Sequence, residues 1–299
     1  MRWLFIGAGN MASSLIGGLL NGGTDKHHVA VIDPDDQART RAQQQFGVLG
    51  NDDVQSGIQA LYASNGVPGE TLSNDTSDRV SSPLVVVIAV KPHIVEPVCR
   101  ALCATVATSS HTPADIVYVS VAAGVQSRDI QAWLPDNAAL VRCMPNTPAL
   151  LGLGVTALFA NEFCNKASRQ RAQTLLDNAG KTLWFEDEAS LDAVTAVSGS
   201  GPAYFFYLIE HMIEAGVSLG LTRDTAQTLA IETAFGAASM AREQTHSPST
   251  LRENVTSKGG TTAAALSVFD QHETPAVIEK AMRAAHDRAQ ELGDELGGN

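Results

Sequence analysis

A glycine-rich turn close to the N-terminus constrains the fold of this chain more than any other feature. Gly7-Ala8-Gly9-Asn10-Met11-Ala12 follows directly on the apolar run 4–6 and begins a helical stretch. In such a turn Gly7 permits the tight bend, Gly9 lets backbone N–H groups approach a pyrophosphate, and Ala12 lets the helix pack closely on the strand. The pattern predicts a dinucleotide bound at the start of the first helix; the alternative is a tight turn without a ligand.

Apolar runs rich in β-branched residues then alternate with helical stretches through the first half of the chain. The runs lie at 29–32, 85–90, 116–121, 140–144 and 155–159. The uninterrupted run 85–90 is typical of a parallel strand that is covered on both faces. We therefore predict an α/β, Rossmann-type open parallel sheet with right-handed crossovers, and surface loops at the polar stretches 62–83 and 107–114.

The strand-like runs stop after about residue 188, so the remainder is predicted to be all-helical. The stretch 202–219 is apolar enough for a helix that is buried nearly all round. Thr222, Ser247 and Thr274 are predicted to cap later helices. We expect a dinucleotide-binding domain over 1–188 and an all-α dimerisation domain over 189–299, because its apolar Ala- and Gly-rich helices suggest contact with another subunit.

Charge and cysteine content exclude several classes of function. The chain has 20 Lys and Arg residues against 32 Asp and Glu residues, a net charge of −12, which argues against binding to nucleic acid or to an anionic membrane surface. Apolar runs are too short to span a bilayer or to form a signal peptide, so we expect a cytoplasmic protein. The 4 cysteines are too sparse for a disulfide framework, and we expect reduced thiols and no metal site.

Three predicted strands end in residues suited to a cofactor. Val90-Lys91-Pro92, Ala122-Ala123-Gly124 and the segment around Asn146 lie where the carboxyl ends of parallel strands form a ligand crevice. Lys91 can hydrogen-bond a cofactor, the small residues leave room for a flat ring, and flanking prolines hold Asn146 in place.

The second strand ends in an acidic residue that bears on the choice of cofactor. Asp33 at such a position ordinarily binds the ribose 2′-hydroxyl of NAD and repels a 2′-phosphate. Arg39 and Arg41 follow closely and can serve a phosphate instead, so these residues leave NAD and NADP both open.

Two further segments in the second half carry a recognisable pattern: Ser198-Gly199-Ser200-Gly201-Pro202-Ala203-Tyr204, and the segment 251–262, which ends Gly259-Gly260-Thr261-Thr262. Together with the strand ends, these segments make the chain resemble the pyrroline-5-carboxylate reductase family from residue 5 to about 291. The resemblance implies reduction of 1-pyrroline-5-carboxylate to L-proline, the last step of proline synthesis, with NADPH or NADH as hydride donor. It also implies a Rossmann domain and a helical domain that interlocks with its partner in a homodimer, often within a larger ring of dimers.

The resemblance also assigns site residues. Ser257, Gly260, Thr261 and Thr262 hold the substrate, with Gly259 in the same turn, and Glu188 matches an acidic residue close to the site. For the cofactor, the resemblance implies binding by Ile6, Gly7, Ala8, Gly9, Asn10, Met11, Asp33, Ala89, Val90, Lys91, Pro92, Ala122, Ala123, Gly124, Asn146 and Asn254.

Four positions depart from the family pattern. Lys258 stands where proline is usual, Glu232 where glutamine is common, Asp53 where an asparagine near the adenosine is frequent, and Asp33 where a small polar residue is typical. The two acidic changes near the adenosine put the family's common NADP preference in doubt here.

The chemistry of a cyclic imine fits these residues. Once protonated, the imine is already electrophilic, and hydride transfer gives a neutral amine, so no strong general acid is required. We expect Thr262 to orient the ring nitrogen, and the glycine pair to form an anion-binding nest for the carboxylate, assisted by Ser257 and Thr261. The plainer interpretation of 257–262 is an inter-helix turn with threonine caps.

Two other functions stay open at this stage. One is a related Rossmann reductase that acts on another imine or a ketone, and the other is a non-catalytic nucleotide-binding scaffold. The glycine turns in both halves of the sequence argue against the scaffold, because it needs no carboxylate nest.

Overall fold

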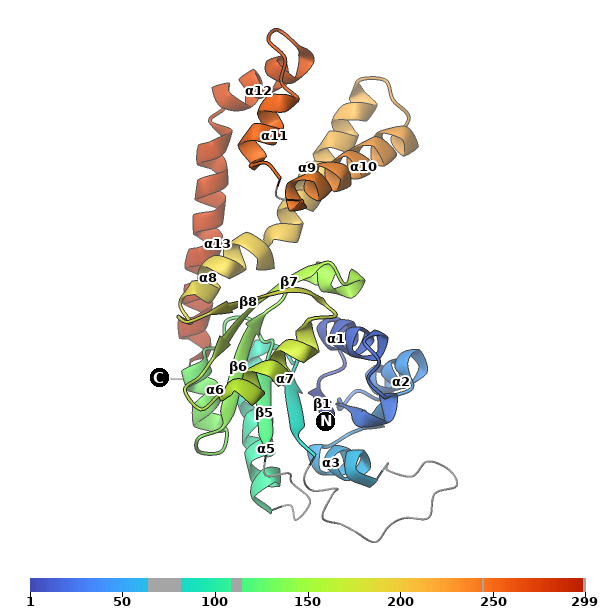
Figure 1. Ribbon diagram of the computed structural model, residues 1–299, viewed down its shortest axis with the longest axis vertical. Coiled ribbons are helices and arrows are strands. Elements are labelled where there is room, and N and C mark those ends of the chain that lie inside the picture. Colours follow the sequence, from blue (N-terminus) through green and yellow to red (C-terminus); the bar gives the residue numbers. More distant parts are fainter. Residues whose placement is uncertain (64–81, 109–114, 244, 298–299) are drawn as a thin grey trace. The chain divides into compact units, whose positions relative to one another are not determined.

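The computed structural model describes residues 1–63, 82–108, 115–243 and 245–297 (Figure 1). The predicted loops at 62–83 and 107–114 lie largely outside these residues. The chain forms two compact units, one of Met1–Gly199 with His286–Asn299 and the other of Ser200–Ala285. The predicted domain boundary between 188 and 189 stays a prediction.

Eight strands of the described chain form one sheet in the first unit. Their order is β3-β2-β1-β4-β5-β6-β7-β8, and all neighbours are parallel except β6 and β7. The strands are β1 (Arg2–Ile6), β2 (Val29–Ile32), β3 (Leu49–Asn51), β4 (Leu84–Ile88), β5 (Ile116–Ser120), β6 (Ala139–Met144), β7 (Gly154–Ala160) and β8 (Gly180–Phe185).

Helices cover both faces of this sheet. Alternate residues of β1 point to opposite faces, so Trp3 and Phe5 join a core with α1 and α7, while Leu4 and Ile6 join another with α3, α5 and α6. The helices are α1 (Asn10–Asn21), α2 (Asp36–Phe46), α3 (Val54–Ala63), α5 (Val95–Thr108), α6 (Ser127–Trp133), α7 (Lys166–Leu176) and α8 (Ser190–Val194), with the short turns η1 (Lys26–His28), η2 (Pro92–Ile94), η3 (Thr147–Leu151) and the π-helical η4 (Thr195–Gly199).

One pair of strands corrects the prediction of a wholly parallel sheet. β7 runs antiparallel to β6. The connection 145–153 holds only the short turn η3. A parallel crossover needs a connection of about a dozen residues or more, and this one is too short for it.

In its described residues the second unit contains helices and their connections but no strand, and α13 continues from it into the first unit. Thr222 and Ser247 cap their helices as predicted, by accepting hydrogen bonds from the backbone of Thr225 and Thr250. The third cap is wrong: Thr274 is itself the first residue of its helix, and its hydroxyl donates to the Phe269 carbonyl instead. The helices are α9 (Gly201–Ser218), α10 (Arg223–Arg242), α11 (Pro248–Asn254), α12 (Thr261–Gln271) and α13 (Thr274–Leu296).

Helix α9 is not buried nearly all round, which corrects a second prediction. Phe205, Phe206 and Tyr207 are 64%, 65% and 65% exposed in the single chain. Its close contact is with α10, where a methyl group on Gly216 would lie 3.1 Å from the Ala226 Cβ atom. The described part of one chain therefore leaves the aromatic stretch of α9 uncovered. None of the described helices is long and apolar enough to cross a membrane.

Candidate active site

The turn after β1 is held in a shape that only glycine adopts easily at position 7. Gly7 has φ +101°, and its N–H donates to the Ile32 carbonyl at 2.7 Å. A Cβ atom on Gly7 would lie 2.5 Å from the Ala89 oxygen. Ala12 is fully buried against the sheet. The packing roles predicted for Gly7 and Ala12 are therefore present in the structure.

The N-terminus of α1 is open in the manner that a dinucleotide requires. Gly9 is the N-cap residue, no side chain caps the helix, and a Cβ atom on Gly9 would meet nothing within 4 Å. The first N–H groups of a helix have no partner within it and carry partial positive charge. Gly9 and Asn10 are exposed. These residues therefore fit a pyrophosphate group.

The neighbouring strand ends complete this edge of the sheet. The Ala89 N–H donates to the Ile6 carbonyl at 2.8 Å, which places the segment 89–92 beside the glycine turn. Lys91 is exposed and precedes Pro92, the first residue of η2. Asp33 lies on the other side of the turn, where its carboxylate accepts a hydrogen bond from the Ala8 N–H at 2.9 Å.

The residues after β5 have small side chains for a reason besides the predicted room for a cofactor ring. Ala122 is buried, and Gly124 has φ +80°. A Cβ atom on Gly124 would lie 3.2 Å from the Leu296 Cδ1 atom and 3.3 Å from the Leu292 Cβ atom. The last turns of α13 therefore need a glycine at 124, independently of any cofactor ring.

Asn146 braces three segments at the end of β6. Its Oδ1 atom accepts a hydrogen bond from the Val155 N–H at 2.9 Å, and its Nδ2 atom donates to the Ser198 carbonyl at 3.1 Å. The residue is 8% exposed. Its amide thus fixes η4 against the strand ends, and its contact with the nicotinamide stays a prediction.

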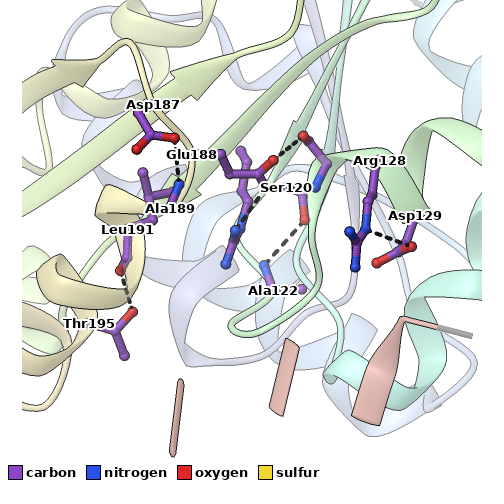
Figure 2. Close-up of polar contacts among 11 residues, drawn as sticks. Ser120, Ala122, Arg128, Asp129, Asp187, Glu188, Ala189, Leu191 and Thr195 are labelled. Atoms are coloured by element: carbon purple, nitrogen blue, oxygen red, sulfur yellow. Dashed lines mark hydrogen bonds and ion pairs between the residues drawn. The ribbon is translucent and has the colours of Figure 1, made fainter. Parts of the chain in front are cut away.

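Glu188 lies in a network that the sequence did not predict (Figure 2). Its carboxylate accepts hydrogen bonds from the backbone N–H of Ser127 at 2.7 Å, from the Ser127 hydroxyl, and from the Arg142 guanidinium at 2.8 Å. The Arg142 side chain is only 6% exposed and that of Glu188 is 20% exposed. A charged residue within the apolar strand 140–144 was the signal for this partnership, because buried arginines are paired.

Arg142 and Glu188 line a cavity of about 370 Å³ within the first unit. Burial raises the pKa of Asp192, and the carboxylates of Glu188 and Asp294 add to the effect, while Arg142 and His286 oppose it. The cavity is lined by Gly124, Gln126, Arg142, Glu188, Ala189, Asp192, Gln290, Gly293 and Asp294. Both oxygens of Glu188 already have protein partners, so its direct binding of substrate stays a prediction.

The predicted substrate residues 257–262 form one turn in the second unit. Gly259 has φ +73°, and the Gly260 N–H donates to the Ser257 carbonyl at 3.0 Å. A Cβ atom on Gly260 would collide with the Ser257 hydroxyl. Helix α12 begins at Thr261 without a side-chain cap, so its first N–H groups are free to bind an anion.

The remaining residues of this region are placed around the turn. Ser257 and Thr261 are exposed, Thr262 is half-buried, and Asn254 is the last residue of α11. Among the described residues, no cluster of His, Cys, Asp and Glu could hold a metal ion.

The sheet order, the glycine turn and the open helix N-terminus define a dinucleotide-binding protein of the Rossmann type. Two family models match the chain, "NADP oxidoreductase coenzyme F420-dependent" over residues 3–124 and "Pyrroline-5-carboxylate reductase dimerisation" over 188–292. The chain is 42% identical to the pyrroline-5-carboxylate reductase of Pseudomonas aeruginosa, over 99% of this chain and 98% of the relative. It is 39% identical to that of Haemophilus influenzae, over 96% of each.

Solved structures show the same fold. The pyrroline-5-carboxylate reductase of Coxiella burnetii matches with a TM-score of 0.82 at 34% identity, covering 97% of this chain and 98% of that one. A Plasmodium falciparum pyrroline carboxylate reductase with NADP bound matches with a TM-score of 0.78 at 23% identity, covering 98% of each.

The chain belongs to the pyrroline-5-carboxylate reductase family. This confirms the predicted family, the fold class and the enzyme class, an NAD(P)H-dependent oxidoreductase. The dimerisation model covers the helical region, including α9, and supports a homodimer.

Proposed function

We propose that this protein reduces 1-pyrroline-5-carboxylate to L-proline, with the first unit holding NAD(P)H and the turn 257–262 holding the substrate. The turn carries the proposal, because it combines a left-handed glycine, an uncapped helix N-terminus and three hydroxyl side chains. Such a combination suits a small carboxylate.

In this proposal the chain acts mainly by positioning. The first N–H groups of α12 and the hydroxyls of Ser257 and Thr261 hold the carboxylate, and Thr262 orients the ring nitrogen. When bound, the reduced nicotinamide supplies a hydride to the imine carbon. The electrons of the C=N double bond pass to nitrogen, whose positive charge is lost, so the product is a neutral secondary amine. Correct positioning alone lowers a barrier by about 7 kcal/mol or more in favourable cases.

We also propose that dimers associate into a larger ring and that the protein acts in the cytoplasm. Apolar side chains exposed on α10, such as Phe235 at 62%, support further association. The free thiols at all four cysteines support a reducing compartment. Sedimentation at several protein concentrations tests the ring: a mass that stays at two chains at every concentration contradicts it.

Proline formation by the purified protein tests the reaction, against a panel of 2-ketoacids as rival substrates. Thr262→Ala should lower kcat by about 10-fold to 100-fold, because one hydrogen bond to the reacting group is lost. The NAD(P)H affinity should not change. Thr262→Ser keeps the hydroxyl and should retain most of the turnover.

Three outcomes count against these assignments. Unchanged turnover in Thr262→Ala would remove Thr262 from the mechanism. Faster turnover of a ketoacid would favour the rival reductase, and tight NAD(P)H binding without turnover of any substrate would favour the scaffold.

A further inference from the structure

We propose that Asp33 and the acidic loop around it make this enzyme select NADH over NADPH, an inference that rests on the dinucleotide-binding role proposed for the first unit. Asp33 follows β2 directly, at the carboxyl edge of the sheet and beside the glycine turn. In sheets of this order, an acidic side chain here accepts a hydrogen bond from the adenosine ribose, on the 2′-hydroxyl that NADP replaces with a phosphate.

The Asp33 carboxylate is fixed in position. Its Oδ2 atom accepts a hydrogen bond from the Ala8 N–H at 2.9 Å, and its Oδ1 atom accepts one from the Asp35 N–H at 2.9 Å. The Asp33 N–H itself donates to the Asn51 carbonyl at 3.3 Å. Each carboxylate oxygen still has a lone pair for a ribose hydroxyl. Because it is tied to the turn that meets the pyrophosphate, the carboxylate cannot swing away when a 2′-phosphate arrives.

The first cationic residue after Asp33 in the sequence, Arg39, is already engaged by the same loop. Arg39 donates to the carbonyls of Asp33 at 2.6 Å and Pro34 at 3.1 Å, and its other terminal nitrogen contacts an Asp36 oxygen at 2.9 Å. The Arg39 side chain is only 18% exposed. Its charge is therefore balanced within the protein, and it is turned toward the loop backbone. Arg41, farther along α2, is exposed.

The helix N-termini beside Asp33 are occupied as well. Asp35 caps α2 by accepting from the Gln37 N–H at 2.9 Å, and Asp53 accepts from the Ser56 N–H at 2.8 Å at the start of α3. The N-termini of α2 and α3, which are the phosphate-binding ends of helices, thus already carry a carboxylate. A 2′-phosphate brings a charge of about −1.5 to −2 into this acidic edge, where like charges repel it.

Binding of each dinucleotide without substrate tests the selection independently of the reaction. We expect NADH to bind at least about 10-fold more tightly than NADPH. Binding of each dinucleotide is measured by the fluorescence of its reduced nicotinamide. Asp33→Ser should reduce this ratio by about 10-fold or more, and Asp33→Asn, which keeps an oxygen for the Ala8 N–H, should reduce it in the same direction. Higher salt should also lower the wild-type ratio, because salt screens charge repulsion.

Asp136→Ser is the matched control, since it removes one exposed carboxylate before β6, at the opposite edge of the sheet. It should leave the ratio unchanged. Equal or tighter binding of NADPH by the wild-type protein would overturn the proposal, as would a ratio that neither Asp33 variant changes or that salt does not affect. Failure to bind either dinucleotide would refute the proposed function itself, whereas tight binding of NADPH alone would refute only the selection.

Discussion

Removal of the Glu188 carboxylate should destabilise the first unit strongly. Glu188→Ala deletes the acceptor of two hydrogen bonds from Ser127 and one from Arg142. It leaves a guanidinium that is 6% exposed without its carboxylate partner. Breaking a buried ion pair from one side costs about 3–5 kcal/mol. Glu188 is one-fifth exposed and lines a cavity, so we expect a loss at the lower end, about 3 kcal/mol, or roughly 100-fold in the unfolding equilibrium constant.

Urea unfolding followed by tryptophan fluorescence measures this loss directly. The 3 tryptophans (Trp3, Trp133 and Trp184) all lie in the first unit, so the signal reports the unit that contains Glu188. The protein concentration must be fixed, because a dimer gains apparent stability as concentration rises.

A double-mutant cycle separates the ion pair from a general packing defect. Arg142→Met together with Glu188→Ala removes both charges, and we expect it to be less destabilised than the sum of the single variants by about 2 kcal/mol. A free energy of unfolding for Glu188→Ala within about 1 kcal/mol of the wild-type value would refute the reasoning. So would a double variant whose loss of stability equals the sum of the two single losses.

Two further predictions concern the glycine turn and the cavity. Gly7→Ala should lower the free energy of unfolding by at least about 1–2 kcal/mol, measured by thermal melting, because residue 7 has a positive φ and lies close to the Ala89 oxygen. Gly9→Val should fold normally and lose NAD(P)H affinity, measured by fluorescence titration. Unchanged stability of Gly7→Ala, or normal NAD(P)H binding by Gly9→Val, contradicts the loop assignment. Burial raises the pKa of Asp192 in the folded state above its ordinary value of 3.8. Between the ordinary pKa and the raised pKa, the folded state holds more protons than the unfolded state, so stability falls as pH rises. Asp192→Asn should therefore be more stable than the wild type at pH 7 and lose this gain below about pH 4, by urea unfolding; an equal gain at both pH values contradicts the argument.

Local sequence signals were enough for the centre of the sheet and its glycine turn. The strands β1, β4 and β5 are built around continuous apolar runs, and the turn at Gly7 is specified by residues adjacent in sequence. The edge strands β3 and β8 were not predicted. β3 has the sequence Leu49-Gly50-Asn51 and exists because β2 offers it a pairing edge, which no local preference reveals.

Long-range contacts account for the other differences. Arg142 and Glu188 are 46 positions apart, so their pairing depends on the order of the strands and not on any local pattern. The apolar content of α9 predicted a helix buried nearly all round, yet its aromatic residues are exposed in the single chain, because burial depends on which other segments reach the helix. The turn at 257–262 could be predicted in shape from its glycines, whereas its ligand came from the resemblance to a family.

The return of α13 to the first unit has a consequence for synthesis on the ribosome. Leu292 and Leu296 pack over Gly124, and Gly293 lies against Gln126. The nucleotide-binding half is translated first, yet this patch stays bare until the ribosome has made every residue of the second unit. A nascent chain that stalls within α12 therefore lacks Leu292 and Leu296, the residues that close the first unit over Gly124.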